Sequence, residues 1–325
     1  MRLLKSAIRI SIAFWALCGL VTAGFAAGNR PVTTLRVGVV VGENVNYRLG
    51  RMEPFRLYLE GQLNRSVTIE ATRNYQALLE AHAKGRIHYA VYSAAAYAKS
   101  WAACRCLEPL AAPKSLSGGH GIRSVLIVAD DAPYKSVQDL NNKRVLYTAP
   151  STLAGHLVPA RAMSMLSGNG NFIFGDADVA KDVLESLSAL KLGNASAIFG
   201  WQGSEGNTRG TISSAEQRGL LEIGSTRVIW QSEFLPHGPH AVLDDLPQEI
   251  IDKLRAALLR LQPTSDETVA SALHSESLRD YSSADVLEAI DANFGGGFAA
   301  VDHYDYLPIL NILGWGTESI VPAWP

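Results

Sequence analysis

Short apolar runs alternate with helix-like segments along most of the chain, and this alternation restricts the folds that are open to it. The runs at 35–41, 67–71 and 87–92 have the length and the β-branched content of buried strands. Helical segments are expected between them, at 46–63 and 75–84. The order strand, helix, strand, helix, strand is typical of an α/β domain whose sheet is largely parallel.

The same order begins again after residue 130. Strands are expected at 143–148 and 195–199, and helices at 154–166 and 179–191. A chain of 325 residues is long enough for two such units. The sequence therefore predicts a second α/β unit.

The chain is expected to pass between the two units twice. The predicted crossings are the apolar segments at 122–129 and 227–230. Lobe 1 is then built from 27–129 and 227–325, and lobe 2 from 130–226. The first lobe is thus discontinuous in sequence, with the second inserted into it.

The first 26 residues have the order of a secretory signal peptide. Residues 1–9 carry three cations and no acid, and an apolar run follows at 10–23. Gly24 and Ala26 supply a pair of small residues, so cleavage is expected after Ala26. A retained anchor is the alternative, although the apolar run is short for a membrane span. We expect the mature protein to be exported to the periplasm.

The charge of the mature chain argues against nucleic acid as a partner. Removing three of the 29 basic residues leaves 26 against 31 acidic ones, a formal charge of −5. The sequence contains no basic run and no basic stripe with interleaved aromatic residues. We therefore expect neither nucleic acid nor an anionic membrane surface to be bound.

Two cysteines remain after cleavage, Cys104 and Cys106. Residues at i and i+2 are poorly placed for an unstrained disulfide, whose Cα atoms usually lie about 5.5 Å apart. Three interpretations stay open, and the sequence favours the last: a strained bridge, a soft-metal ligand pair, or buried small residues.

The segment at 150–159, PSTLAGHLVP, leaves an apolar strand through two hydroxyl residues and then continues as a helix. Ser151 or Thr152 can simply cap the helix by accepting hydrogen bonds from its first N–H groups. The same N–H groups and the helix dipole can instead hold an anion. Both interpretations remain open on this segment alone.

Three segments carry a family resemblance. They are 85–97 (GRIHYAVYSAAAY), 136–145 (SVQDLNNKRV) and 150–159, in the same order and spacing as in phosphate/phosphonate-type periplasmic binding proteins. The segments 236–247 and 302–308 also fit. The chain therefore resembles the solute receptors of ABC importers, and the match extends over almost the whole mature chain.

The resemblance implies the type II periplasmic binding protein fold, with two α/β lobes of mostly parallel strands and a cleft that closes on a ligand. It implies a small-molecule ligand such as phosphate or a phosphonate, an ABC permease as partner, a monomer, and no cofactor or metal. A sensor subunit that reports to a membrane kinase would need the same cleft, so this alternative stays open.

Several positions depart from the family pattern by lacking its hydroxyl, histidine or aspartate side chains. Leu153 and Ala154 stand where the family places two hydroxyls, and Ala177 stands at its histidine. Ser196 and His88 occupy two positions where the family has aspartate. Because a buried anion needs several donors, these losses imply a weaker oxyanion site or a different, less charged ligand.

The candidate ligand-binding residues combine the two turns with nearby aromatic and acidic side chains. They are Tyr47, Tyr92, Ser93, Tyr97, Ser151, Thr152, Gly155, Asp178 and Trp201. The four aromatic residues could line a cleft with flat faces, or they could belong to the cores of the lobes.

Two other classes of function have less support in the sequence. An enzyme is not expected, because the sequence has no nucleophile elbow, no phosphate loop with lysine and no zinc-protease helix motif. The only residues in the sequence that suggest a metal or redox role are His237 and His240 in HGPH, together with Cys104 and Cys106.

Overall fold

The computed structural model describes residues 32–41, 45–149, 152–167, 174–263, 281–290 and 295–314. The predicted signal peptide at 1–26 and the candidate Ser151 lie outside these residues. Within the described ranges, no helix has the length and apolar character needed to cross a membrane.

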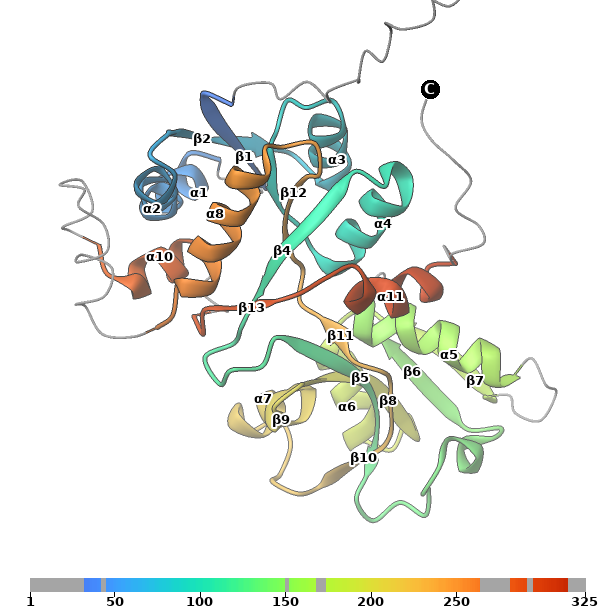
Figure 1. Ribbon diagram of the computed structural model, residues 1–325. Helices are drawn as coiled ribbons and strands as arrows, with labels where there is room; N and C mark the ends of the chain where they lie inside the picture. The colour runs from blue at the N-terminus through green and yellow to red at the C-terminus, as the bar shows by residue number, and fades with distance from the viewer. Residues whose placement is uncertain are drawn as a thin grey trace, which may run out of the picture. The chain divides into compact units, whose positions relative to one another are not determined.

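The first sheet contains six strands, in the order β13-β4-β12-β3-β1-β2 (Figure 1). Their bounds are β1 (Thr34–Val40), β2 (Ser66–Thr72), β3 (Tyr89–Val91), β4 (Leu107–Pro113), β12 (His240–Leu243) and β13 (Phe298–Ala300). β1 runs parallel to β2 and β3, whereas β12 pairs antiparallel with both β3 and β4. β12, which comes from late in the chain, therefore lies between β3 and β4 inside the sheet.

Helices on either side of this sheet complete the first core. They are α1 (Val45–Arg51), α2 (Glu53–Leu63), α3 (Tyr75–Ala83), α4 (Ala94–Cys104), α8 (Gln248–Arg260), α10 (Ser283–Ile290) and α11 (Leu307–Ile312). The hydroxyl of Tyr58 in α2 donates to the carbonyl of Ala257 in α8 at 2.7 Å. Early and late parts of the chain thus share one hydrophobic core.

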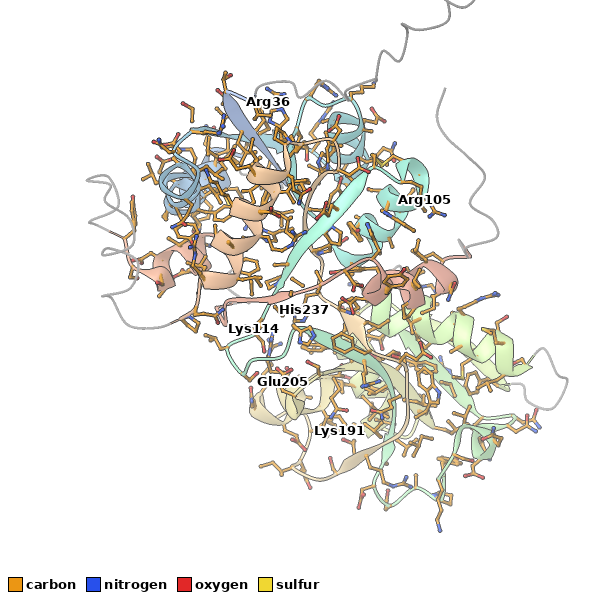
Figure 2. All side chains as sticks on the ribbon, viewed as in Figure 1. Arg36, Arg105, Lys114, Lys191, Glu205 and His237 are labelled. Atoms are coloured by element: carbon orange, nitrogen blue, oxygen red, sulfur yellow. A yellow bond between two sulfur atoms is a disulfide. The ribbon has the colours of Figure 1, made fainter. Side chains whose placement is uncertain are left out.

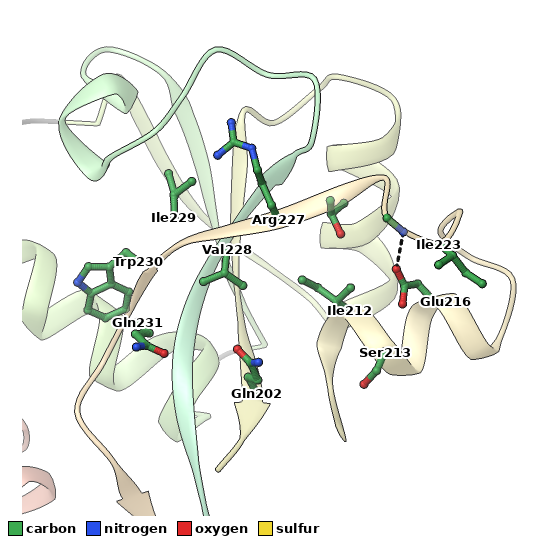
Figure 3. Close-up of a pocket in the computed structure, with 12 residues that line it drawn as sticks. Gln202, Ile212, Ser213, Glu216, Ile223, Arg227, Val228, Ile229, Trp230 and Gln231 are labelled. Carbon is green, nitrogen blue, oxygen red and sulfur yellow. Dashed lines mark hydrogen bonds between the residues drawn. The ribbon is translucent and has the colours of Figure 1, made fainter. Parts of the chain in front are cut away.

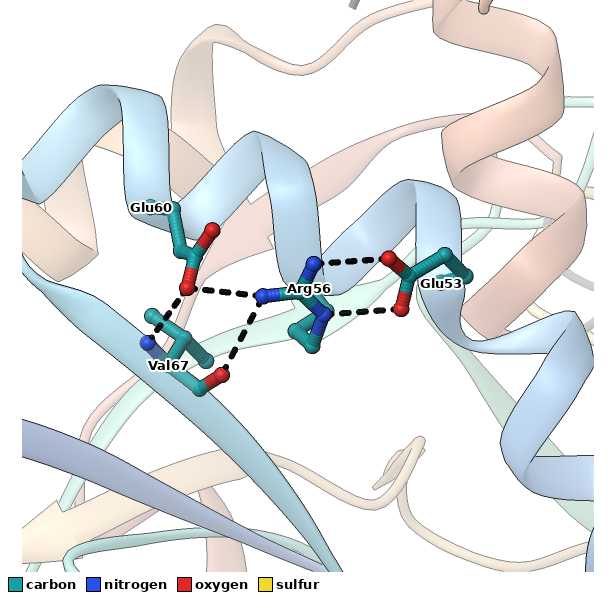
Figure 4. Close-up of polar contacts among 4 residues, drawn as sticks. All are labelled: Glu53, Arg56, Glu60 and Val67. Atoms are coloured by element: carbon teal, nitrogen blue, oxygen red, sulfur yellow. Dashed lines mark hydrogen bonds and ion pairs between the residues drawn. The ribbon is translucent and has the colours of Figure 1, made fainter. Parts of the chain in front are cut away.

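An ion-pair network ties α2 to the neighbouring strand β2 (Figure 4). The Arg56 guanidinium contacts Glu53 at 2.6 Å and Glu60 at 2.7 Å, and it also donates to the carbonyl of Val67. Glu60 in turn accepts from the N–H of Val67 at 2.9 Å. The hydrogen bond from Arg56 lowers the pKa of the Glu53 carboxyl. Because the groups are partly exposed, each pair contributes at most about 1 kcal/mol.

The second sheet has the path β10-β5-β8-β6-β7, with β11 paired to β5 and β9 paired to β8. The bounds are β5 (Gly121–Ala129), β6 (Arg144–Thr148), β7 (Asp176–Ala180), β8 (Ala197–Gly203), β9 (Gly206–Gly210), β10 (Thr226–Gln231) and β11 (Leu235–Pro236). Its helices are α5 (Val158–Ser167), α6 (Val183–Lys191) and α7 (Thr211–Gln217), with short helical turns η1 (Val137–Leu140) and η2 (Leu153–Leu157).

Strand β5 is buried on both faces, which explains why its sequence is continuously apolar. Val125 and Ile127 belong to a core on one side of the sheet, and Leu126 and Val128 to a core on the other. The two cores are separate because successive side chains of a strand point to opposite faces.

The mixed α/β organisation expected from the alternating pattern is confirmed. The parallel pairs of β1 with β2 and β3, and of β6 with β8, join strands that the sequence predicted. β7, which pairs parallel to β6, was not predicted. The helix expected at 179–191 is wrong in its first turn. Val179 and Ala180 extend β7 alongside β6, and α6 begins only at Val183, after its cap Asp182.

The chain changes sheet between Pro113 and Gly121, and again between Pro236 and His240. β5 and β10, where crossings were expected, pair with each other inside the second sheet. The division into lobes at 129/130 and 226/227 stays a prediction.

Cys104 and Cys106 form a disulfide, so the favoured interpretation as free buried residues is wrong. Their Cα atoms lie 5.0 Å apart, within the usual range for a bridge. Arg105 between them adopts a left-handed conformation at the end of α4, with φ of 52°. This turn brings the two cysteines together, and it could not be anticipated from their spacing.

Candidate functional site

A cavity of about 330 Å³ lies where the parallel strands β1 and β3 end. Val39 and Val40 of β1 line it, together with Val91 of β3 and the following Tyr92. Both carboxyl ends reach the same edge of the sheet because the strands are parallel. In open α/β sheets this edge is the usual place for a ligand.

Both sheets contribute to the lining of this cavity. Met52 and Ile290 line it from the α2 and α10 regions, and His240 lines it from β12. Ile122 and Leu153 come from β5 and η2 of the second sheet. A ligand bound here would therefore contact elements of both sheets, which is the requirement for closure on a ligand.

The first turn of α4 opens onto the cavity through Ser93 and Ala94. Ser93 caps the helix, and its hydroxyl oxygen accepts from the N–H of Ala96 at 3.3 Å. The first N–H groups of an α-helix have no partner within the helix, and the helix dipole adds a partial positive charge there. This end of the cavity therefore favours negative charge.

Arg48 of α1 is the one cationic side chain in the described lining, which contains no aspartate or glutamate. Its neighbour Arg51 is engaged elsewhere, with Glu288 at 3.3 Å. His237 and His240 also line the cavity, and burial lowers the pKa of each imidazole. At neutral pH the net charge of the lining is therefore positive.

Tyr92 reaches the cavity from a buried position. Its hydroxyl lies 3.0 Å from Nδ1 of His82, which has no exposed surface. Burial raises the pKa of the Tyr92 hydroxyl and lowers the pKa of the His82 imidazole to about 4. Both groups are therefore neutral at physiological pH.

His240 has a buried nitrogen without a hydrogen bond. Its ring has no exposed surface, and Nδ1 contacts the hydroxyl of Tyr89. No described residue pairs with Nε2. An unsatisfied buried polar atom costs about 1–3 kcal/mol, so such an atom on a residue that lines a cavity requires an explanation.

Of the candidate residues predicted from sequence, the structure brings Tyr92 and Ser93 together in this cavity. Tyr47 lies on α1 with 65% of its surface exposed, outside the lining. Tyr97 is only 1% exposed, and its hydroxyl lies 2.6 Å from Nδ1 of His303. Tyr97 therefore belongs to the core beside the cavity and not to its wall.

In the turn after β6, Ser151 lies outside the described residues, and the candidates Thr152 and Gly155 do not line the cavity. The hydroxyl of Thr152 donates to the carbonyls of Thr148 and Ala149, both at 2.8 Å, and makes no cap hydrogen bond to the helix. Gly155 is buried, and a Cβ at this position would overlap the carbonyl oxygen of Thr148. Among the described residues of this turn, Leu153, a departure from the family pattern, lines the cavity.

The remaining two candidates lie elsewhere on the second sheet. Asp178 is exposed on β7 and lies 3.8 Å from the guanidinium of Arg144. Trp201 is in β8, with the guanidinium of Arg209 at 5.9 Å from its ring. Neither residue lines the cavity at β1 and β3.

Sequence reasoning missed Arg48 and Met52, and it considered His237 and His240 only as metal ligands. Nδ1 of His237 lies 2.8 Å from the carbonyl of Pro113. Among the described residues no group of three or more His, Cys, Asp or Glu side chains is placed to hold a metal ion. The signal for Arg48 was its position on the predicted helix directly after the first strand.

Next to the cavity, the segment 114–120, in which the chain passes from the first sheet to the second, is hydrogen-bonded to the second sheet. Figure 2 labels Glu205 and His237 in this region. The Glu205 carboxylate, at the turn between β8 and β9, accepts from the hydroxyls of Ser115 at 2.8 Å and Ser117 at 2.6 Å. These bonds fix the path of the chain between Pro113 and Gly121.

A larger hollow of about 880 Å³ lies along β10, away from these residues (Figure 3). It is lined by Glu216, Arg227 and Trp230 among others, and Glu216 already accepts from the N–H of Gly224 at 2.9 Å. None of the candidate residues lines it. We assign the functional site to the smaller cavity, which combines strand ends, a helix N-terminus and an arginine.

The chain is similar to proteins of known families. Residues 47–306 match the model of the ABC transporter, phosphonate, periplasmic substrate-binding protein family. The phosphate-import protein PhnD of Mycolicibacterium smegmatis is 23% identical over 230 residues, which cover 68% of this chain and 70% of that protein.

Two solved structures have the same fold. XAC2383 from Xanthomonas citri bound to ATP has a TM-score of 0.56 at 13% identity, covering 87% of this chain and 96% of that one. PhnD1 from Prochlorococcus marinus in complex with methylphosphonate has a TM-score of 0.51 at 14% identity, covering 88% and 100%. The two-sheet architecture, the match over 47–306 and the curated relative agree. The chain belongs to the phosphonate-type periplasmic substrate-binding proteins of ABC transporters.

Proposed function

We propose that the cavity at the ends of β1 and β3 binds a small phosphorus oxyanion, with Arg48 as its counter-charge. The observation that carries the proposal is that Arg48 and the first turn of α4 share a cavity whose described lining contains no carboxylate. An anion gains from both groups, and a cationic ligand would find no partner among them.

The class of ligand is also supported by the relatives. The curated relative is named as a phosphate-import protein, and the two structural neighbours are bound to ATP and to methylphosphonate. All three names refer to phosphorus oxyanions. The chain would deliver its ligand to an ABC permease, as a monomer exported by the signal at 1–26, and the family is one of transport receptors and not of enzymes.

The pocket is proposed to differ from the family pattern in its donors. The hydroxyl and histidine positions of the family are Leu153, Ala154 and Ala177 here, and Leu153 adds an apolar surface to the cavity. A guanidinium can replace several lost donors, because it offers a planar fork that matches two oxygens of a phosphonate. Arg48 thus compensates for the missing hydroxyls.

The proposal is tested by thermal unfolding of the mature protein with phosphate, phosphite, methylphosphonate, methanesulfonate and an uncharged heterocycle. A ligand at about 100 times its dissociation constant adds roughly 2.7 kcal/mol, which raises the midpoint by several degrees. We expect at least one phosphorus oxyanion to do so. A shift with the uncharged compound alone would contradict the proposal.

Replacing Arg48 with glutamine should weaken binding of that oxyanion about 10- to 100-fold. A charge-assisted hydrogen bond is worth about 1.5–3 kcal/mol, which corresponds to this factor. Arg51→Gln is the matched control, because Arg51 lies on the same helix but pairs with Glu288. Titration calorimetry at fixed ionic strength measures both variants. Equal affinities for R48Q and R51Q would show that Arg48 does not bind the ligand.

A further inference from the structure

The cavity has a second polar feature, at the position of His240. The ring is enclosed by aromatic side chains, with its centroid 4.9 Å from that of Phe298, 5.6 Å from that of Tyr89 and 6.0 Å from that of Phe55. Met52 is one helical turn before Phe55, so the two side chains lie on the same side of α2. Met52 and His240 both line the cavity.

The hydrogen-bond partners of the His240 ring indicate which of its nitrogens carries the proton. Tyr89 has no exposed surface, and the described contact of its hydroxyl is with Nδ1 of His240. If Nδ1–H donated to Tyr89, the tyrosine hydrogen and the Nε2 lone pair would both be left without partners. If Tyr89 donates to Nδ1, Nε2–H is the single unsatisfied group. The second arrangement is favoured, so Nε2 is a donor.

The imidazole is also neutral, because burial lowers the pKa of His240 to about 3. The cavity therefore has two different polar ends. Arg48 and the first turn of α4 provide positive charge, whereas His240 provides one uncharged donor within an apolar surface that includes Val39, Met52 and Ile290. A neutral donor in such a place recognises an oxygen without demanding a full negative charge.

We propose that Nε2–H of His240 donates a hydrogen bond to an oxygen on the organic substituent of the ligand. The inference rests on the proposed function, in which the oxyanion itself is held by Arg48 and α4. It specifies the ligand as a phosphorus oxyanion whose short substituent carries a hydroxyl, ether or carbonyl oxygen. Because His240 is fully buried, the proposal requires the lining around its ring to open for the ligand.

The test compares two probes of nearly equal shape, hydroxymethylphosphonate and ethylphosphonate. Wild-type protein should bind the hydroxymethyl compound about three- to tenfold more tightly, which is the usual gain from one neutral hydrogen bond. His240→Phe keeps the volume of the ring and removes the donor, so the preference should disappear. The ratio of the two affinities is informative because a purely structural role would change both equally.

A measurement on the wild-type protein makes the test independent of how the variant folds. The Nε2–H resonance of His240, followed by ¹⁵N NMR, should shift with hydroxymethylphosphonate and not with ethylphosphonate. Equal affinities for the two probes, or an unshifted resonance when the hydroxymethyl compound is bound, would overturn the inference alone. If neither probe nor phosphate binds the wild type, the proposed oxyanion function fails with it.

Discussion

The free energy of unfolding is expected to fall steeply as the pH is lowered from about 6.5 to 4. His82 and His240 have no exposed surface, and burial lowers their pKa values to about 4 and about 3, from 6.5. In the unfolded chain both imidazoles take up protons below pH 6.5, whereas in the folded protein they stay neutral. The unfolded state then binds more protons, so stability is lost with falling pH.

Each of these histidines contributes a slope of up to about 1.4 kcal/mol per pH unit. Two of them acting between pH 6 and pH 4 would remove roughly 5 kcal/mol, which is comparable to the whole stability of many domains. Denaturant unfolding at a series of pH values measures this slope. His240→Phe should reduce it by about one proton, and an unchanged slope in that variant would contradict the assignment.

Gly238→Ala is expected to be the most damaging single substitution in the cavity wall. A Cβ at this position would overlap the carbonyl oxygen of Tyr92 and lie 2.6 Å from Cα of Ser93. These are backbone atoms at the end of β3, where the N–H of Tyr92 also donates to the carbonyl of Pro239 at 3.1 Å. Neither segment can move without breaking that bond, so we expect a loss of several kcal/mol.

Ligand binding should be lost in the same variant, because displacing Tyr92 and Ser93 distorts the first turn of α4. Gly50→Ala is the matched control, since Gly50 lies in α1 and a Cβ there meets nothing within 4 Å. That control should be neutral or stabilising by up to about 1 kcal/mol. An unchanged unfolding midpoint for G238A would show that the two segments are less tightly packed than described.

The parts of the fold that follow local patterns could be predicted from sequence. β1, β3 and α3 were expected, because each is a run of one periodicity bounded by a turn residue. β4 was not expected, since its sequence LEPLAAP contains two prolines. The strand forms because β12 and β13 pair with it from distant parts of the chain, and this long-range pairing leaves no local signal.

The site could be predicted only where it consists of strand ends. Tyr92 and Ser93 follow β3 directly, and such positions lie at the ligand-binding edge of a parallel sheet. His240 is distant from both in sequence, and it reaches the cavity because β12 inserts beside β3. For Tyr97 the sequence left cleft and core open, and the structure places it in the core, where it packs on Tyr306 with ring centroids 4.7 Å apart.

The central position of β12 has a consequence for how the chain folds after export. β3 and β4 do not pair with each other, and β12 (240–243) pairs with both of them. Until that segment has crossed the membrane, the first sheet therefore consists of two incomplete parts. The strands of the second sheet all lie within 121–236 and emerge earlier. They can pair while β3 and β4 still present open edges, and open edges invite aggregation. The first sheet is therefore the last to be completed, and its unpaired strands are the part of the nascent protein most in need of protection.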